Sequence, residues 1–163
     1  MKLMILIIML LPLAAFAQTE CNLVKETDPY TKETKYSSGF MSLQGATLNI
    51  EGNSKEIDFF FVIPGKCFTD GTTGLVYFDG TRTRATIRNA GTMNCEGNYH
   101  ITFRNGNATT SVLKKLGTMK VAQFVFKGSD DKDVVIELLP EHQAALMPAA
   151  SCVTETAKTL LKP

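Results

Sequence analysis

Residues 55–68 read KEIDFFFVIPGKCF, and this stretch decides the fold class. Residues 57–63 are almost entirely apolar and include three consecutive phenylalanines. Side chains of an extended chain alternate between two faces, so both faces of this strand are apolar apart from Asp58. A strand of that kind is normally covered on both faces, which predicts a central position in the fold. Pro64 and Gly65 then end the strand.

Short segments in which apolar and polar residues alternate lie on both sides of this strand. Residues 47–51 precede it across the turn Gly52-Asn53, and we expect the two segments to form an antiparallel pair. Turn residues recur roughly every ten residues without intervening helices, which is typical of antiparallel sandwiches and barrels. We expect an all-β antiparallel β-sandwich, in preference to a barrel. Further strands are expected at residues 22–28, 33–37, 75–78, 83–88, 98–104, 119–127 and 133–139. We expect the first two of these to form an edge hairpin and the last two to form a late hairpin.

Two segments depart from the strand pattern. Residues 111–116 fit either a strand or one helical turn. Near the C-terminus, Pro140 suits a first helical position, Pro148 is expected to interrupt the helix, and Ser151 suits the N-cap of a second one. The sequence therefore predicts a short C-terminal helical segment that covers an edge or a face of the sandwich.

The first 17 residues have the pattern of a secretory signal peptide. Lys2 supplies a positive start, residues 3–13 are apolar, and Ala15-Phe16-Ala17 provides the small-x-small pattern that a signal peptidase recognises. The alternative, a buried N-terminal helix of the folded domain, fits this pattern less well. We expect cleavage after Ala17 and a single exported domain over residues 18–163, either periplasmic or secreted, with no transmembrane segment.

The charge balance disfavours polyanionic partners. The chain has 17 Lys and Arg against 16 Asp and Glu, and residues 1–17 contain one charged side chain, Lys2. The exported chain would therefore carry 16 of each sign and a formal net charge of zero. A domain with no net charge is not expected to bind nucleic acid.

The four cysteines all lie in the expected exported part and are well separated in sequence. The absence of a CxxC unit argues against a zinc site or a redox motif. An even number of cysteines in an oxidising compartment favours two disulfides, which can connect in three ways. We favour a Cys67–Cys95 bridge in the middle of the domain and a Cys21–Cys152 bridge between its ends, with no catalytic thiol.

Motifs for catalysis are missing from the sequence. The two histidines are not in metal-ligand spacing, and there is no GxSxG, Walker A or dinucleotide motif. Asp70-Gly71 and Asp79-Gly80 could place carboxylates at loop tips, but such steps are more often turns. The acidic residues at 130, 131 and 133 lack an EF-hand pattern and fit a solvated hairpin turn. We therefore predict no metal, no cofactor and no catalytic residue.

Asp58 is the one polar residue within the apolar strand. If it is buried, it must be paired or hydrogen-bonded, because an isolated buried carboxylate is costly. The favoured interpretation places it near the end of the strand, close to solvent or to a basic partner.

A row of arginines is the sharpest surface feature in the sequence. Arg82, Arg84 and Arg88 fall on one face of the strand at residues 83–88, and His100 would extend the row if the strand at residues 98–104 pairs beside it. Aligned guanidinium groups can bind a carboxylate, sulfate or phosphate. The alternative is a solvated face paired with acids on a neighbouring strand. We predict a candidate anion site at these four residues.

The run VYFDGTRTRATIRNAGTMNCEGNYHITF, followed by KKLGTMKVAQFVFKG, resembles small exported β-proteins of unknown function from Gram-negative bacteria. The shared features are an Asp-Gly turn, a Cys-Glu-Gly turn and a late strand pair before a short helix. The resemblance implies an exported bacterial β-domain and carries over no catalytic residue.

These observations favour a non-enzymatic exported binding or structural domain, whose partner would be a protein or a small anionic ligand. A hydrolase that uses loop carboxylates such as Asp70 or Asp79 is the first alternative. A secreted inhibitor of a partner enzyme is the second. A deep cleft that converges on carboxylates and His100 would favour the hydrolase.

Overall fold

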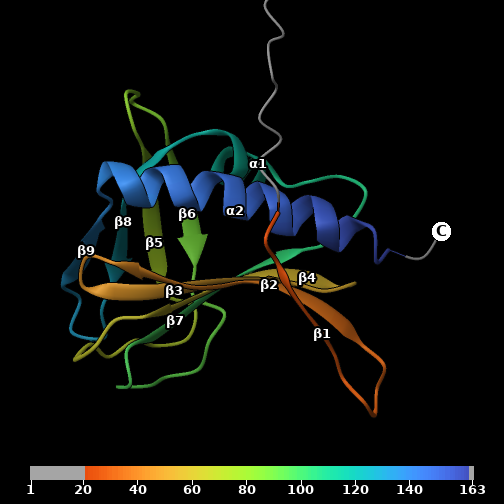
Figure 1. Cartoon of the computed structure of the whole chain (residues 1–163). Coiled ribbons are helices and arrows are strands. Elements are labelled where there is room, and N and C mark those ends of the chain that lie inside the picture. The colour runs from red at the N-terminus through yellow and green to blue at the C-terminus, as the bar shows by residue number, and fades with distance from the viewer. Residues whose placement is uncertain (1–20, 162–163) are drawn as a thin grey trace, which may run out of the picture.

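A computed structural model describes residues 21–161 of the chain. Nine strands in this range form two antiparallel sheets, and two helices complete the fold (Figure 1). We call the five-stranded sheet the large sheet and the four-stranded one the small sheet. The large sheet contains, in spatial order, β1 (Val24–Thr27), β2 (Thr34–Leu43), β3 (Ala46–Gly52), β4 (Glu56–Val62) and β7 (Asn98–Arg104). The small sheet contains β6 (Arg84–Arg88), β5 (Thr73–Phe78), β8 (Val121–Lys127) and β9 (Asp133–Glu137).

The antiparallel sandwich-like fold confirms the expected fold class. The expected pair of residues 47–51 with the apolar strand is β3 against β4, where Ile50 faces Phe59. The expected first hairpin is β1 with β2, and the late hairpin is β8 with β9. In Figure 1 the strands of the small sheet run across those of the large sheet.

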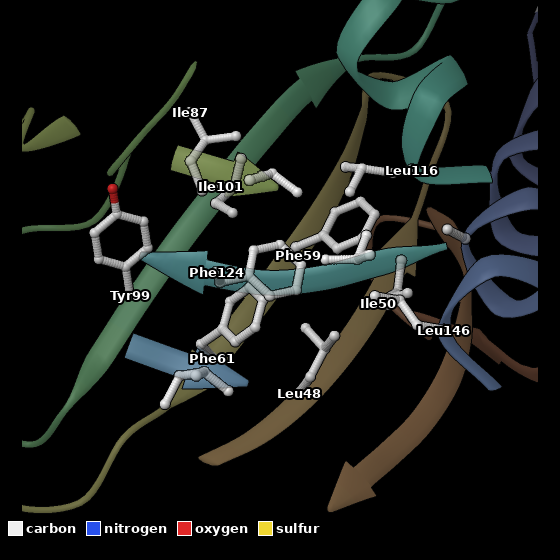
Figure 2. Packing of buried hydrophobic residues seen from close by; sticks show 14 of the residues in the cluster. Leu48, Ile50, Phe59, Phe61, Ile87, Tyr99, Ile101, Leu116, Phe124 and Leu146 are labelled. Carbon is white, nitrogen blue, oxygen red and sulfur yellow. The ribbon is translucent and has the colours of Figure 1, made fainter. Parts of the chain in front are cut away.

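The core lies between the two sheets and is rich in aromatic side chains. From β4, Phe59 and Phe61 point inward and are fully buried (Figure 2). The ring centroid of Phe61 lies 4.9 Å from that of Phe124 and 5.0 Å from that of Phe126, both on β8. Burial of one such side chain stabilises a fold by about 1.5–3 kcal/mol, so this contact does much to hold the sheets together.

The expectation that both faces of the apolar strand are covered is wrong. The inward residues of β4 are buried, but Phe60 and Val62 on its outer face remain exposed, Phe60 by 36%. An antiparallel sheet can pack one face on a core and leave the other in contact with solvent. Here the outer face stays open and still carries large apolar side chains.

The ambiguous segment at residues 111–116 is helical, and the two expected C-terminal helices are one. Helix α1 (Ser111–Thr118) begins after Thr110, whose hydroxyl accepts from the backbone N–H of Leu113. Helix α2 (Pro140–Lys158) runs without a break through Pro148, so the predicted interruption there is wrong. The last turns of α2 pack closely on β3, since a Cβ built on Gly52 would lie 2.8 Å from that of Ala157. Packing of four buried α2 residues offsets the missing proline N–H; they are Leu146, Ala150, Val153 and Ala157.

Both expected disulfides are present. Cys67 bonds Cys95, and Cys21 bonds Cys152, which attaches α2 to the segment before β1. Two disulfides indicate a chain that folds in an oxidising compartment.

The expected signal peptide lies outside the described residues. Within residues 21–161, no helix has the length and apolar character needed to span a membrane.

Candidate functional site

The arginines of the predicted anion site lie at one edge of the small sheet. Arg84 and Arg88 are exposed on the outer face of β6, and Arg82 lies in the turn before it. Arg88 Nε donates to the carbonyl oxygen of Gly71 at 3.0 Å. None of the salt bridges within residues 21–161 involves an arginine. The alternative, a row paired with acids on a neighbouring strand, is therefore not seen within these residues, and anion binding there stays a prediction.

His100 lies on the other sheet. Its strand, β7, pairs with β4 and not with β6, so His100 does not extend the arginine row. The backbone N–H of His100 instead donates to Asn89 Oδ1, at 3.0 Å, in the loop that follows β6. The four residues of the predicted site thus divide between two sheets.

The imidazole of His100 belongs to a small cluster with Asp58 and Thr102. His100 Nε2 lies 2.8 Å from Asp58 Oδ1, and the Thr102 hydroxyl donates to the same oxygen at 2.8 Å. Asp58 is only 6% exposed and lies within β4, rather than near solvent at the end of the strand. Its carboxyl group is satisfied by side chains of β7, as a buried carboxyl must be.

Phe60 covers this cluster on one side. Its ring stacks on that of His100, with centroids 4.2 Å apart and an interplanar angle of 18°. Because the two residues are direct cross-strand neighbours, their side chains stand side by side on the outer face of the large sheet. The stack fixes the position of both rings, and Phe60 remains partly exposed to solvent.

A second hydrogen-bonded network lies beside the first, on β2 and β3. Ser37 Oγ donates to Asn49 Oδ1 at 2.8 Å, and Asn49 Nδ2 donates to Glu51 Oε1 at 2.8 Å. Glu51 also forms a salt bridge with Lys35, at 3.2 Å. Ser37 and Asn49 are buried although they lie on the outer side of the sheet. Fully paired polar groups of this kind make a rigid surface.

The strand registers join these parts into one row across the sheet. Phe40 lies opposite Asn49, Asn49 opposite Phe60, and Phe60 opposite His100. We call these four residues the aromatic row. Phe40, on β2, is 77% exposed, which is unusual for a phenylalanine. Val62 lies beside the row on the next outward position of β4 and is also exposed.

The aromatic row lies on an open surface. Five surface depressions of about 160–690 Å³ lie elsewhere: between the helices, at the first hairpin, at the β3–β4 turn with the loop after β7, and near the Cys21–Cys152 bridge. None of them is lined by a residue of the aromatic row. Small-molecule sites are usually concave, so this surface suits a large, flat partner better.

The loop carboxylates considered for a hydrolase do not form a pair. Asp70 precedes β5 and Asp79 follows it, so the two lie at opposite ends of a six-residue strand. Such a strand spans about 20 Å, whereas the carboxylates of glycoside hydrolases lie about 5–9.5 Å apart. Both residues are exposed in turns, as the turn interpretation expects.

The acidic residues of the β8–β9 turn are engaged with lysines. Lys127 Nζ lies 2.7 Å from Asp133, and Lys132 Nζ lies 3.3 Å from Asp130. The hydrogen bond from the backbone N–H of Lys132 lowers the pKa of Asp130 below its usual value. Within residues 21–161, no group of three or more His, Cys, Asp and Glu side chains is placed to hold a metal ion.

Comparison with known proteins gives no relative. No family model, curated protein or solved structure matches the chain. The candidate site therefore rests on the chemistry of its own residues.

Sequence reasoning singled out His100, which belongs to the aromatic row, and Asp58, which lies beside it, but it did not predict that the two side chains pair. It missed Phe40 and assigned Phe60 to a covered face. Strict alternation along β4 and β7 does place Phe60 and His100 opposite to the core. The missing information was that these two strands are neighbours.

Proposed function

We propose that the chain is a non-enzymatic exported binding protein, periplasmic or secreted, that docks a partner protein on the outer face of its large sheet. The observation that carries the proposal is the aromatic row, in which Phe40 and Phe60 are presented on a hydrogen-bonded, rigid base. Aromatic side chains, phenylalanine included, are enriched at protein interfaces relative to the rest of the surface.

The shape and charge of the face favour a protein over a small ligand. Phe40, Phe60 and Val62 provide apolar surface, and buried or half-buried polar groups surround them. An apolar centre with a polar rim is the usual composition of a protein–protein interface. The acids Glu51 and Asp58 are both engaged by neighbouring side chains, so the face has no free charge at its centre.

The same features count against the hydrolase alternative. The Asp58–His100–Thr102 cluster has the residue types of an acid–base site, but the pair is packed under Phe60 and opens into none of the five depressions. The cluster supports the surface and positions Phe60. The disulfides and the predicted signal peptide support export.

The experiment is a quantitative capture from cells that produce the protein. The immobilised oxidised chain is compared with Phe40→Ser and with Tyr30→Ser, an exposed aromatic in the β1–β2 turn that serves as the matched control. We expect one stoichiometric protein partner with the wild type and the control. Phe40→Ser should weaken its binding at least about thirtyfold, as expected for a central aromatic contact.

Two results would contradict the proposal. In the first, the Phe40→Ser variant captures the same partner as the wild type with equal affinity. This result would place the interface elsewhere. The other is turnover of a substrate by the chain that is lost on substitution of His100, which would make the cluster catalytic.

A further inference from the structure

The outer face of the small sheet has an ordered distribution of charge. The strand registers define a row across the sheet that runs, in order, through Arg84, Tyr77, Gln123 and Glu137. Arg84 and Glu137 therefore lie at the two ends of this row. Four positions along the strands, Arg88 lies opposite Thr73 on one edge. On the other edge, Asp133 lies opposite Lys127. One edge of the face is therefore basic and the other acidic.

An apolar row separates the two charged rows. Leu75 lies opposite Thr86 and Val125, and Val125 lies opposite Val135. Val135 is 47% exposed, and Leu75 and Val125 are half-buried. Neither Arg84, Arg88 nor Glu137 forms a salt bridge within residues 21–161. The face thus has an apolar centre and unpaired charges at Arg84, Arg88 and Glu137. Asp133 already forms a salt bridge with Lys127 of its own chain, at 2.7 Å.

We propose that this face binds a second copy of the same chain, as a two-fold symmetric dimer. A two-fold axis that lies in the interface, parallel to the strands, exchanges the β6 edge with the β9 edge and leaves positions along the strands unchanged. Arg84 of one copy then meets Glu137 of the other, and Arg88 meets Asp133. Leu75 meets Val125, and the apolar rows pack on each other.

The arrangement is self-complementary because every contact occurs twice. An isologous interface requires that one patch match itself after the two-fold rotation. Here the basic edge matches the acidic edge, which a row of like charges on both edges would not do. Two β-sheets that pack face to face in this way are common in proteins, with strands within about 30° of each other.

The dimer leaves the proposed binding face free. The outer faces of the two sheets lie on opposite sides of the core, so dimerisation through the small sheet would present two aromatic rows, one on each side. Such a bivalent protein binds a clustered partner more tightly than a monomer does. The dimer and the partner site can therefore be tested separately.

The face is small, which sets the expected affinity. Four strands of about five residues cover roughly 15–20 Å in each direction, or about 450–800 Å² over both copies, which is below the range of stable specific interfaces. We therefore expect a weak dimer, with a dissociation constant on the order of micromolar that rises with salt.

The test is sedimentation equilibrium of the oxidised chain. We expect reversible dimerisation of the wild type. The double variant Arg84→Glu, Arg88→Glu and the double variant Asp133→Arg, Glu137→Arg should each raise the dissociation constant at least about tenfold, because like charges then face each other. Because all four residues are exposed, circular dichroism should show that both variants stay folded.

Mixing the two charge-reversed variants gives the sharpest outcome. In the mixed dimer, each reversed edge meets an edge of opposite charge, so affinity should return to about the wild-type value. Val135→Ser should weaken the dimer without reversing any charge.

Three results would overturn the inference. The first is a wild-type chain that stays monomeric up to about 1 mM, where even weak specific dimers form. The second is a mixture that associates no better than its components. The third is a ladder of larger species, which would show head-to-tail pairing of the β6 and β9 edges.

Discussion

Tyr99 is fully buried in the core, and its hydroxyl donates to the carbonyl oxygen of Thr72 at 2.9 Å. Burial raises the pKa of Tyr99 from 10.0 to about 12. Because the folded chain holds this proton more tightly than the unfolded chain does, the associated stability is present below pH 10 and is lost as the pH rises to about 12. The loss amounts to about 2–3 kcal/mol of unfolding free energy.

Tyr99→Phe isolates this effect. At neutral pH the variant should lose about 1 kcal/mol of unfolding free energy, because the hydrogen bond is removed. Between pH 10 and 12 its unfolding free energy should fall less than that of the wild type. Denaturant unfolding at a series of pH values measures both. An identical alkaline fall in the two proteins would contradict the assignment to Tyr99.

Thr102 tests the polar cluster beneath Phe60. Thr102→Val removes the hydroxyl that donates to Asp58 but keeps the shape of the side chain. We expect a loss of about 1–2 kcal/mol in unfolding free energy, because Asp58 is buried and retains His100 alone among its side-chain partners. Thr92→Val, at an exposed position, should change stability by less than about 0.5 kcal/mol. Equal stability of Thr102→Val and the wild type would show that the hydrogen bond is not needed.

At the scale of elements, β3 and α2 can approach closely because position 52 is a glycine and has no side chain. A Cβ on Gly52 would lie 2.8 Å from the Cβ of Ala157 and 2.9 Å from Cγ1 of Val153. Gly52→Ala should therefore destabilise the protein by about 1–3 kcal/mol, measured by denaturant unfolding. Gly106→Ala is the matched control and should be nearly neutral, because no atom lies within 4 Å of a Cβ built there.

A compensating change identifies the cause. Adding Ala157→Gly to Gly52→Ala removes one of the two close contacts and should recover part of the loss, beyond what the sum of the single variants predicts. If the two losses simply add, the close approach of β3 and α2 is not the source of the destabilisation.

Most elements, but not their arrangement, could be predicted from the sequence. A continuous apolar run located β4, alternation located β6 and β7, and turn residues located the hairpins, because these signals are local. The pairing of β7 with β4 joins segments far apart in sequence, and no local pattern encodes it. Pro148 was misjudged because tertiary packing of α2 outweighs the local cost of a proline.

The candidate site was harder to predict than the fold for the same reason. Phe60 and His100 each follow from alternation, but the aromatic row exists only because β2, β3, β4 and β7 are adjacent. The cysteine pairing was predictable because an even number of distant cysteines offers few choices.

At the scale of the whole molecule, the two disulfides should contribute unequally. The Cys21–Cys152 bridge closes a loop over a separation of 131 residues, whereas Cys67–Cys95 closes one of 28. In the chain-entropy model each disulfide adds about 3–5 kcal/mol to the unfolding free energy, and the bridge that closes the longer loop adds about 1 kcal/mol more than the other. The Cys21→Ser, Cys152→Ser variant should thus unfold at lower denaturant than the Cys67→Ser, Cys95→Ser variant. The reverse order would show that local geometry outweighs loop length.

The central claim is that the outer face of the large sheet binds a partner protein. Site-specific photo-crosslinking tests this claim most directly. A photoreactive phenylalanine analogue replaces Phe40, or Tyr30 in the control, and the protein is irradiated in the cells that produce it. We predict one discrete crosslinked protein species from position 40 and none from position 30. The absence of any crosslink at position 40, or the same species from both positions, would contradict the claim.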